Sequence, residues 1–256
     1  MDTKSYLRRL DLDEISGADF SSLERMQERH LLLVPFENLD IMEGLPISLE
    51  PSAVYDKIVT RRRGGICYEL NSSFAALLEA LGYKVQMLAA ELRQQDGSYG
   101  IPYDHMTLRV DLPEGPYLVD VGYRRSFRHP IPLVATEEIR QFGETYGLRK
   151  DGDDWILERY ERTEMGMMPL YRFKEGACEI ADFDGACQFH QTSPASGLTK
   201  GLVVTAATPD GRVRLDESEL RINQRGRLEV IAIKDFEDRS RMLRRYFGIK
   251  SAVRMF

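Results

Sequence analysis

The spacing of hydrophobic and polar residues is helical over the first third of the chain. Ser21, with Glu24 three positions later, is typical of a helix capping box, and apolar residues then recur at helical spacing until Pro35. Similar patterns predict helices over 51–60 and 67–81. The N-terminal part of the chain is therefore expected to be helical.

The spacing drops to two residues from position 84, which is typical of strands with one buried face. Alternation predicts strands over 84–92, 104–112 and 117–123, and Pro113-Glu114-Gly115-Pro116 predicts a hairpin turn between the last two. A second hairpin is predicted around 151–154. Because short loops rather than helices join these strands, we expect an antiparallel sheet or barrel.

The end of the chain combines strands with a helix. Turn sequences around 209–211 and 223–226 predict strand pairs, and a helix is predicted over 235–247 with Gly248 after it. This order of elements is typical of the α+β class. We therefore expect three packed parts, with the bounds 1–83, 84–195 and 196–256.

The composition is that of a globular protein and excludes several classes of function. The chain has 256 residues, of which 43% are hydrophobic and 30% charged, and its formal net charge is −6. Because nucleic-acid binding needs a positive field, we expect no nucleic-acid partner. No apolar run approaches the roughly 20 residues of a membrane-spanning helix, and the charged first residues do not resemble a signal peptide. We expect a cytoplasmic protein with free cysteines and no membrane partner.

The sequence offers one weak candidate for a metal site. Cys187 and His190 have the spacing C-x-x-H, and Cys178 precedes them. Zinc sites usually have four ligands, and no fourth ligand is evident. Because free cysteines are usually small buried residues, we interpret Cys178 and Cys187 as structural thiols and expect no metal.

Cys67 differs from the other cysteines because it follows Gly64-Gly65-Ile66 and begins a predicted helix. A thiol at a helix N-terminus faces unpaired amide hydrogens and the positive end of the helix dipole, which favour the thiolate. The arginines at 61–63 add positive charge. From these residues alone, Cys67 is as readily a small structural residue as a nucleophile, and a nucleophile also needs a base.

The chain has four histidines that can serve as this base. His30 lies on the apolar face of a predicted helix, which is typical of a core residue. His129 and His190 are expected in loops, where they are exposed. His105 begins an alternating strand and is therefore the best candidate.

Asp120 lies between two valines in the strand that follows His105. A buried carboxylate of this kind needs a partner. A hairpin register that sets His105 opposite Gly122 makes Asp120 its diagonal neighbour on the same face. Cys67, His105 and Asp120 then form a thiol triad, in which the aspartate fixes the tautomer of the histidine.

Three segments resemble motifs of the arylamine N-acetyltransferases. The RGGxCxExN motif of this family resembles Arg63-Gly64-Gly65-Ile66-Cys67-Tyr68-Glu69-Leu70-Asn71. The VPFENL segment resembles Val34-Pro35-Phe36-Glu37-Asn38-Leu39, and the DVGF segment resembles Asp120-Val121-Gly122-Tyr123. The motifs occur in the family's order and spacing, and the later part of the chain extends the resemblance over its whole length.

The resemblance implies an N-terminal helical bundle, a central antiparallel β-barrel and a C-terminal α/β lid, with a triad like that of cysteine proteases. It implies a ping-pong reaction in which acetyl-CoA acetylates Cys67, and an arylamine, arylhydrazine or N-hydroxyarylamine then takes the acetyl group. By motif match, His105 is the base and later the acid, and Asp120 orients it. Glu69 and Asn71 are expected to support the loop geometry. The implied role is in xenobiotic metabolism.

The resemblance also implies contacts with substrates. Phe36 and Tyr123 match positions whose aromatic rings line the acceptor pocket. Gly122 and Thr208 match positions near CoA in some relatives.

The sequence departs from the family pattern directly after Gly122. Tyr123 stands where phenylalanine is usual, and Arg124 and Arg125 follow where glycine is common. The two guanidinium groups either meet the phosphates of CoA, narrow the acceptor pocket, or are solvated surface charges. We include both as candidates for CoA binding.

A triad in the order Cys, His, Asp also suits other enzymes. One alternative is an acyltransferase or amide synthase that uses a different acyl donor. Another is a thiol hydrolase or transglutaminase-like enzyme. A non-catalytic binding protein is expected to lack a triad residue, and all three are present.

Overall fold

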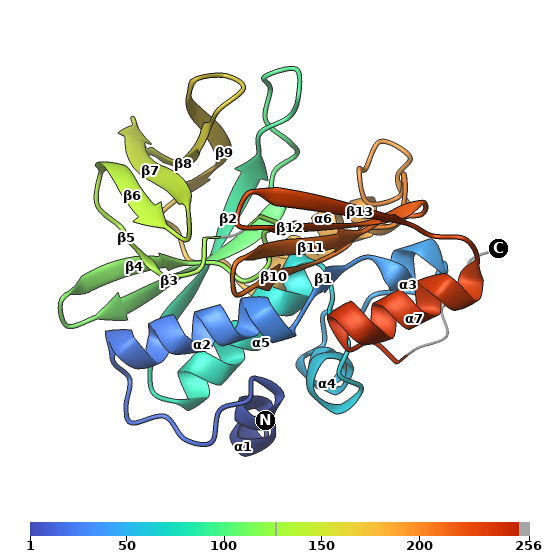
Figure 1. Cartoon of the computed structure of the whole chain (residues 1–256). Coiled ribbons are helices and arrows are strands. Elements are labelled where there is room, and N and C mark those ends of the chain that lie inside the picture. The colour runs from blue at the N-terminus through green and yellow to red at the C-terminus, as the bar shows by residue number, and fades with distance from the viewer. Residues whose placement is uncertain (126, 251–256) are drawn as a thin grey trace.

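The computed structural model describes residues 1–125 and 127–250 and combines helices with two antiparallel sheets (Figure 1). The helices are α1 (Thr3–Arg9), α2 (Phe20–Leu33), α3 (Leu39–Met42), α4 (Pro51–Tyr55), α5 (Cys67–Ala80), α6 (Asp184–Thr192) and α7 (Phe236–Phe247). A π-helical turn, Asp56–Thr60, follows α4, and a 3₁₀ turn, Ile180–Phe183, precedes α6. The predicted α+β class is confirmed.

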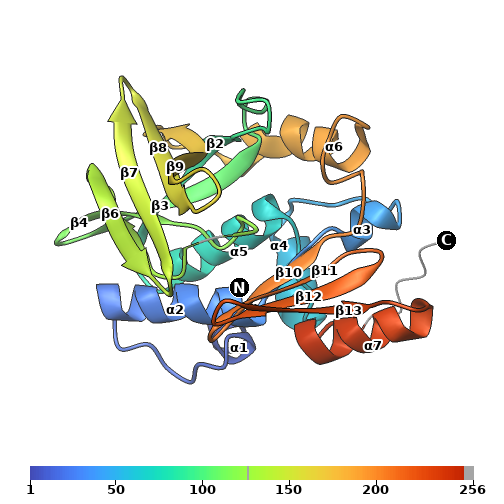
Figure 2. The same ribbon diagram turned by 45° about the horizontal axis from the view of Figure 1, so that its top comes forward.

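The larger sheet has eight strands and curls into a nearly closed barrel in the order β5-β4-β3-β2-β9-β8-β7-β6 (Figure 2). Its strands are β2 (Lys84–Leu92), β3 (His105–Leu112), β4 (Gly115–Val119), β5 (Ile131–Pro132), β6 (Thr136–Gln141), β7 (Glu144–Asp151), β8 (Asp154–Glu161) and β9 (Gly166–Lys174). The hairpins predicted around 113–116 and 151–154 are confirmed as β3–β4 and β7–β8.

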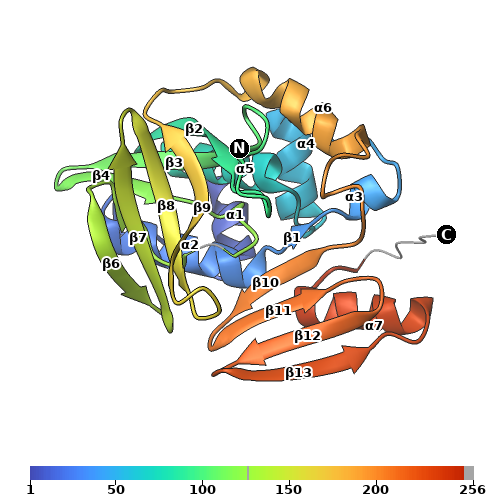
Figure 3. The ribbon, with the colours of Figure 1, turned by 90° about the horizontal axis from the view of Figure 1, so that it is seen from above.

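The smaller sheet has five strands in the order β1-β10-β11-β12-β13, and α7 covers one of its faces (Figure 1). Its strands are β1 (Phe36–Glu37), β10 (Val204–Thr208), β11 (Gly211–Leu215), β12 (Glu219–Gln224) and β13 (Arg227–Ala232). The strand pairs predicted near the end of the chain are confirmed. Because β1 pairs with β10, the segment before α3 joins the N-terminal and C-terminal parts (Figure 3).

Two local predictions in the helical part were wrong. Asp19, not Ser21, caps α2, since its side chain accepts a hydrogen bond from the N–H of Ser22. The predicted helix over 51–60 is α-helical only to Tyr55 and then widens into the π-helical turn. Both misjudgements concern helix ends, where the choice among several capping residues depends on the entering loop.

The hydrophobic core crosses the predicted boundary near residue 83. Helix residues such as Leu70 and Phe74 pack in one cluster with Met106, Leu108 and Val110 of β3. Thus the strand that begins with His105 is packed against the helix that begins with Cys67. None of the helices in the described ranges is sufficiently long and apolar to span a bilayer.

Candidate active site

Cys67 is the first residue of α5, and its residue surface is only 6% exposed. The turn that precedes it requires glycine, because a Cβ on Gly64 would lie 1.9 Å from the carbonyl oxygen of Pro35. Glu69 accepts a hydrogen bond from the N–H of Ile66 at 3.0 Å, which ties the first turn of the helix to the turn before it. The remaining free N–H groups of this first turn lie beside Cys67.

The prediction that the arginines at 61–63 add a positive field at Cys67 was wrong for two of them. Arg63 is buried and donates hydrogen bonds to Glu37 at 2.8 and 3.0 Å and to Asp40 at 2.9 Å. Arg61 pairs with Asp56 at 2.8 Å. These charges are neutralised by carboxylates, so Cys67 gains little from them.

His105 and Asp120 meet because of the hairpin register. The paired register of β3 and β4 ends at Leu108–Val119, so His105 and Asp120 both lie just beyond it. Nε2 of His105 is 2.7 Å from Oδ2 of Asp120, and both side chains are buried. The predicted contact between His105 and Asp120 is confirmed, although β4 ends at Val119 and Asp120 follows it.

The carboxylate of Asp120 is held by several further donors. Its Oδ1 accepts hydrogen bonds from Nδ2 of Asn71 at 3.0 Å and from the N–H groups of Gly122 and Tyr123 at 2.8 and 2.9 Å. Its Oδ2 accepts a bond from the hydroxyl of Tyr171 at 3.1 Å. Burial raises the pKa of Asp120, but His105, Asn71 and Gly122 together outweigh burial and lower it.

These contacts also decide the charge of His105. Burial alone lowers the pKa of the imidazole, whereas the charge and hydrogen bond of Asp120 raise it, with a smaller contribution from a hydrogen bond with the thiol of Cys67. The net pKa of His105 is raised to about 10. Because Nε2 faces Asp120, Nδ1 is the ring nitrogen left for Cys67. The arrangement therefore pairs an imidazolium with the sulfur at the helix start.

Sequence reasoning missed Tyr171. This residue lies in β9, 51 positions from Asp120, and its ring centroid is 5.2 Å from that of His105. The pairing of β2 with β9 brings it to the site, and no local motif indicates that pairing. Asn71 bridges the same region, since its amide also donates to the carbonyl of Met106 at 2.6 Å and accepts from the N–H of Val121 at 3.0 Å.

The two aromatic candidates for the acceptor pocket lie near different members of the triad, since Phe36 pairs with Gly65 in the turn before Cys67. Tyr123 packs edge-on against His105, with ring centroids 5.8 Å apart. Phe36, in β1, is 7% exposed and lies under the guanidinium of Arg124, whose Cζ is 5.9 Å from the ring centroid. Gly122 lies against the start of α5, because a Cβ there would be 2.7 Å from Cα of Cys67.

The three polar candidates for CoA binding lie in different surroundings. Arg124 is half-buried, whereas the side chain of Arg125 is 59% exposed and lies 3.3 Å from Glu161. Thr208 ends β10, and its hydroxyl is buried with no hydrogen-bond partner among the described residues.

Comparison with known proteins agrees with this geometry. A family model described as N-acetyltransferase matches residues 19–255. The arylamine N-acetyltransferase of Mycolicibacterium smegmatis is 34% identical over 90% of this chain and 86% of its own. The chain belongs to the arylamine N-acetyltransferase family. It is therefore an acyltransferase, and family membership favours acyl transfer over the alternative of a thiol hydrolase.

Solved structures of acetyltransferases share the fold. The M. smegmatis enzyme has a TM-score of 0.90 at 33% identity and covers 97% of this chain and 92% of its own. A structure of the Mycobacterium marinum enzyme in complex with CoA has a TM-score of 0.89 at 31% identity and covers 97% and 93%. A Bacillus cereus enzyme described with a Cys-His-Glu triad is 23% identical and shares the fold at a TM-score of 0.90.

His190 of the acetyltransferase is also buried, so the expectation that it is an exposed loop residue was wrong. His190 lies in α6 and is 8% exposed. Its Nδ1 is 2.9 Å from the hydroxyl of Ser196, and its Nε2 is 2.9 Å from Oδ1 of Asp104. Within 1–125 and 127–250, no group of three or more His, Cys, Asp or Glu side chains is arranged to hold a metal ion.

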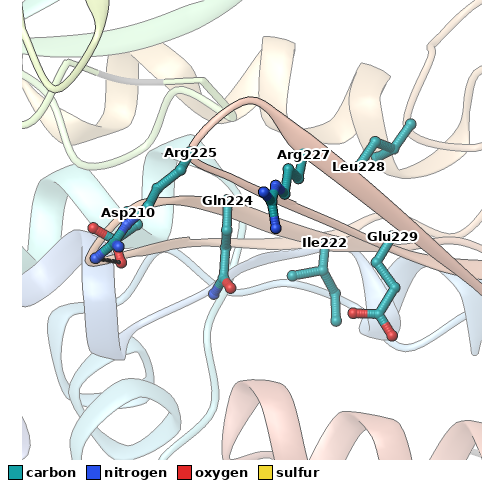
Figure 4. Close-up of a pocket in the computed structure, with 7 residues that line it drawn as sticks. All are labelled: Asp210, Ile222, Gln224, Arg225, Arg227, Leu228 and Glu229. Atoms are coloured by element: carbon teal, nitrogen blue, oxygen red, sulfur yellow. Dashed lines mark ion pairs between the residues drawn. The ribbon is translucent and has the colours of Figure 1, made fainter.

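A hollow also occurs on the C-terminal sheet of the acetyltransferase, and it contains none of the triad residues (Figure 4). It is lined by Asp210, Ile222, Gln224, Arg225, Arg227, Leu228 and Glu229. Because it lies on β12, β13 and the turns beside them, it offers none of the groups that acyl transfer needs.

Proposed function

We propose that this acetyltransferase moves an acetyl group from acetyl-CoA to an arylamine, arylhydrazine or N-hydroxyarylamine by a ping-pong mechanism through acetyl-Cys67. The observation that carries the proposal is the 2.7 Å contact of Asp120 with His105, whose imidazole interacts electrostatically with the thiol at the start of α5. A thiol paired with an imidazolium is a nucleophile at neutral pH.

In the first half-reaction, Sγ of Cys67 attacks the carbonyl carbon of the thioester. The charge that develops on the carbonyl oxygen is favoured by free N–H groups of the first turn of α5. The C–S bond to CoA then breaks, and His105 gives its proton to the leaving sulfur. The products are acetyl-Cys67 and CoA as the thiol.

In the second half-reaction, the amine nitrogen attacks the acetyl carbon of acetyl-Cys67. His105 takes the proton from the nitrogen, the C–S bond breaks, and Cys67 leaves as the thiolate beside a protonated His105. Asp120 holds the imidazole in one orientation through both steps. The hydrogen bond from Tyr171 supports this carboxylate without contact with the reacting atoms.

Phe36 and Tyr123 are the proposed walls of the acceptor pocket, because Phe36 pairs with Gly65 in the turn before Cys67 and Tyr123 packs against His105. Arg124, Arg125 and Thr208 are the proposed contacts with CoA. Thr208 is supported by its buried hydroxyl, which has no partner in the described part of the chain. Gly122 contributes by allowing the loop to approach Cys67.

The test is intact mass spectrometry of the protein after incubation with acetyl-CoA alone. Acetylation adds about 42 Da to one cysteine, and peptide mapping locates it at Cys67. Addition of an arylamine should remove this mass and release the acetylated amine. A protein that gains no mass from acetyl-CoA but gains it from another acyl-CoA would favour the amide synthase alternative.

A further inference from the structure

The turn that leads into His105 has a strained backbone. Tyr103 has a φ of +63°, in the left-handed region that residues other than glycine rarely adopt. Two residues later, His105 begins β3 and pairs with Ala90 of β2. A strained turn persists only where the surrounding structure holds it. The position of His105 therefore depends on the contacts that fix this turn.

The carboxylate of Asp104 makes one of these contacts. Its Oδ2 accepts a hydrogen bond from the N–H of Leu92, the last residue of β2, at 3.2 Å. The same oxygen lies so near Gly100 that a Cβ there would be 2.0 Å away, so this close approach needs glycine. Asp104 therefore ties the turn to the end of the neighbouring strand.

The hydroxyl of Tyr68 makes a second contact and connects the turn with the nucleophile. Tyr68 directly follows Cys67 in α5 and is buried. Its hydroxyl donates to the carbonyl oxygen of Tyr103 at 2.8 Å and to that of Asp104 at 3.1 Å. A shift of Asp104 would therefore disturb the residues next to both Cys67 and His105.

His190 contacts the other oxygen of Asp104 from α6. Its Nε2 is 2.9 Å from Oδ1 of Asp104, and its ring centroid is 6.1 Å from that of Tyr68. Nε2 is not aligned for a hydrogen bond with this oxygen, so the contact depends on attraction between charges. A buried carboxylate needs such a partner, and an imidazole supplies it when both ring nitrogens carry a proton.

The surroundings of the second ring nitrogen suit this charged form. Nδ1 of His190 is 2.9 Å from the hydroxyl oxygen of Ser196, which also accepts a hydrogen bond from the N–H of Leu198 at 3.1 Å. A hydroxyl oxygen has two lone pairs, so one is left to accept the proton on Nδ1. His190 is therefore held between a hydroxyl and a carboxylate, which together fix its ring.

We propose that Asp104 and His190 are positioning residues for the acetylation of Cys67, and that their ion pair fixes the turn from which His105 enters β3. The inference rests on the proposed function. The polar atoms of both side chains are occupied by contacts within the protein, so the pair acts through His105 and not on a substrate. Misplacement of a reacting group by about 1 Å can slow a reaction a hundredfold.

The test measures acetylation of Cys67 by intact mass over a range of acetyl-CoA concentrations. His190→Gln removes the positive charge but keeps a side-chain N–H, and Asp104→Asn removes the partner charge. We expect each to lower the rate at saturating acetyl-CoA by about tenfold, as for a small misplacement, with an unchanged half-saturating concentration. Because the two residues act as a unit, the double variant should lose no more than either single variant.

Alkylation of Cys67 by iodoacetamide, located by peptide mapping, provides a measurement without acetyl-CoA. It should also slow in both single variants, because the thiolate depends on a correctly placed imidazole. His190→Lys keeps a positive charge and should restore part of both rates. Two controls should leave the rates unchanged: Cys187→Ala, one turn earlier in α6, and His129→Gln, which breaks a histidine contact of 3.0 Å with Glu24.

Wild-type rates in a folded His190→Gln protein would overturn the inference. So would additive losses in the double variant, or a change confined to the half-saturating concentration, which would indicate a contact with CoA. Should His190→Gln not fold, Ser196→Ala removes only the hydroxyl that orients the ring and should lower both rates severalfold; unchanged rates there would overturn the inference. Failure of the proposed function is seen separately, because wild-type Cys67 would then gain no acetyl group from acetyl-CoA.

Discussion

Nε2 of His105 lies 2.7 Å from Oδ2 of Asp120, just beyond the last paired residues of the β3–β4 hairpin. Asp120 directly follows Val119, the last residue of β4, and the chain turns there toward α5. The turn lets one carboxylate oxygen bind the imidazole while the other accepts two backbone N–H groups. The orientation of the imidazole therefore depends on this carboxylate.

Asp120→Asn is expected to slow acetylation of the enzyme by about a hundredfold or more, as in other triads. The amide keeps the shape but removes the charge that raises the pKa of His105 to about 10. With the charge lost, His105 is neutral at neutral pH, so alkylation of Cys67 near pH 6 should also slow. Both rates are measured on the same preparation. A folded mutant that matches wild type in both would remove Asp120 from the mechanism.

Tyr171→Phe is a milder change at the same carboxylate. It removes one hydrogen bond to Oδ2 of Asp120 and leaves the ring against His105. We expect a loss of acetylation rate of about tenfold or less, since Asp120 keeps its hydrogen bonds from Asn71 and from the N–H groups of Gly122 and Tyr123. A loss as large as that of Asp120→Asn would indicate that Tyr171 itself contacts the reacting atoms.

Cys67→Ala is expected to abolish acetyl transfer while the fold survives. Cys67 is the cysteine at a helix start beside His105, whereas Cys187 lies in α6 and is 2% exposed. Cys187→Ala should lower the melting temperature but leave turnover nearly unchanged, because it removes only packing. Near-normal transfer by Cys67→Ala, measured with acetyl-CoA and an arylamine, would show that another group carries the acetyl.

Gly122→Ala is expected to inactivate the enzyme, because the added Cβ would lie 2.7 Å from Cα of Cys67 and 2.5 Å from Nδ2 of Asn71. The backbone at Cys67 or the loop at Gly122 must then shift, and this shift displaces Asp120. Gly185→Ala is the matched control, since a Cβ on this α6 residue meets nothing within 4 Å. Circular dichroism and acetylation rate are compared for both. Full activity in Gly122→Ala would show that the loop is free to move.

Arg125→Gln is expected to raise KM for acetyl-CoA by about two- to fivefold at low salt, as for one exposed charge pair, and to weaken the dependence of KM on salt. Arg241→Gln is the control, because Arg241 is an exposed arginine on α7 that pairs with Asp238. An unchanged KM at low ionic strength would leave Arg125 as a surface charge paired with Glu161.

The stability of the protein is expected to fall as pH drops below about 6.5, in part through His30. Burial, and to a lesser extent Arg9, lowers the pKa of His30 to about 3, whereas an unfolded chain has the ordinary value of about 6.5. Between these values the unfolded chain binds a proton that the folded chain does not, so the free energy of unfolding decreases with decreasing pH.

His30→Gln should weaken the dependence of the free energy of unfolding on pH. Urea midpoints at pH 7.5 and pH 5 give the comparison, and the difference between the two midpoints should be smaller in the variant than in wild type. Because His30 bonds Tyr6 at 3.1 Å and packs on Phe74, the variant is less stable at both pH values. An equal pH dependence in both proteins would exclude His30 as a source.

The sequence by itself predicted the elements that depend on neighbouring residues. The alternation after residue 84, the turn at 113–116 and the helix start at Cys67 are local patterns, and each is confirmed. The sequence also indicated the contact between His105 and Asp120, because a short hairpin turn leaves little choice of register. Local patterns therefore predicted that His105 and Asp120 are neighbours, whereas the catalytic roles of the triad stay a prediction.

Tertiary structure decided the charges and contacts around that triad. Tyr171 reaches Asp120 only because β9 closes against β2, and Arg63 is neutralised only because β1 brings Glu37 beneath α5. Arg124 lies over the ring of Phe36, and Phe36 pairs with Thr205 from the other end of the chain. Coulomb energies and burial depend on distances in space, and spacing along the sequence does not give distances between segments that pack from opposite ends of the chain.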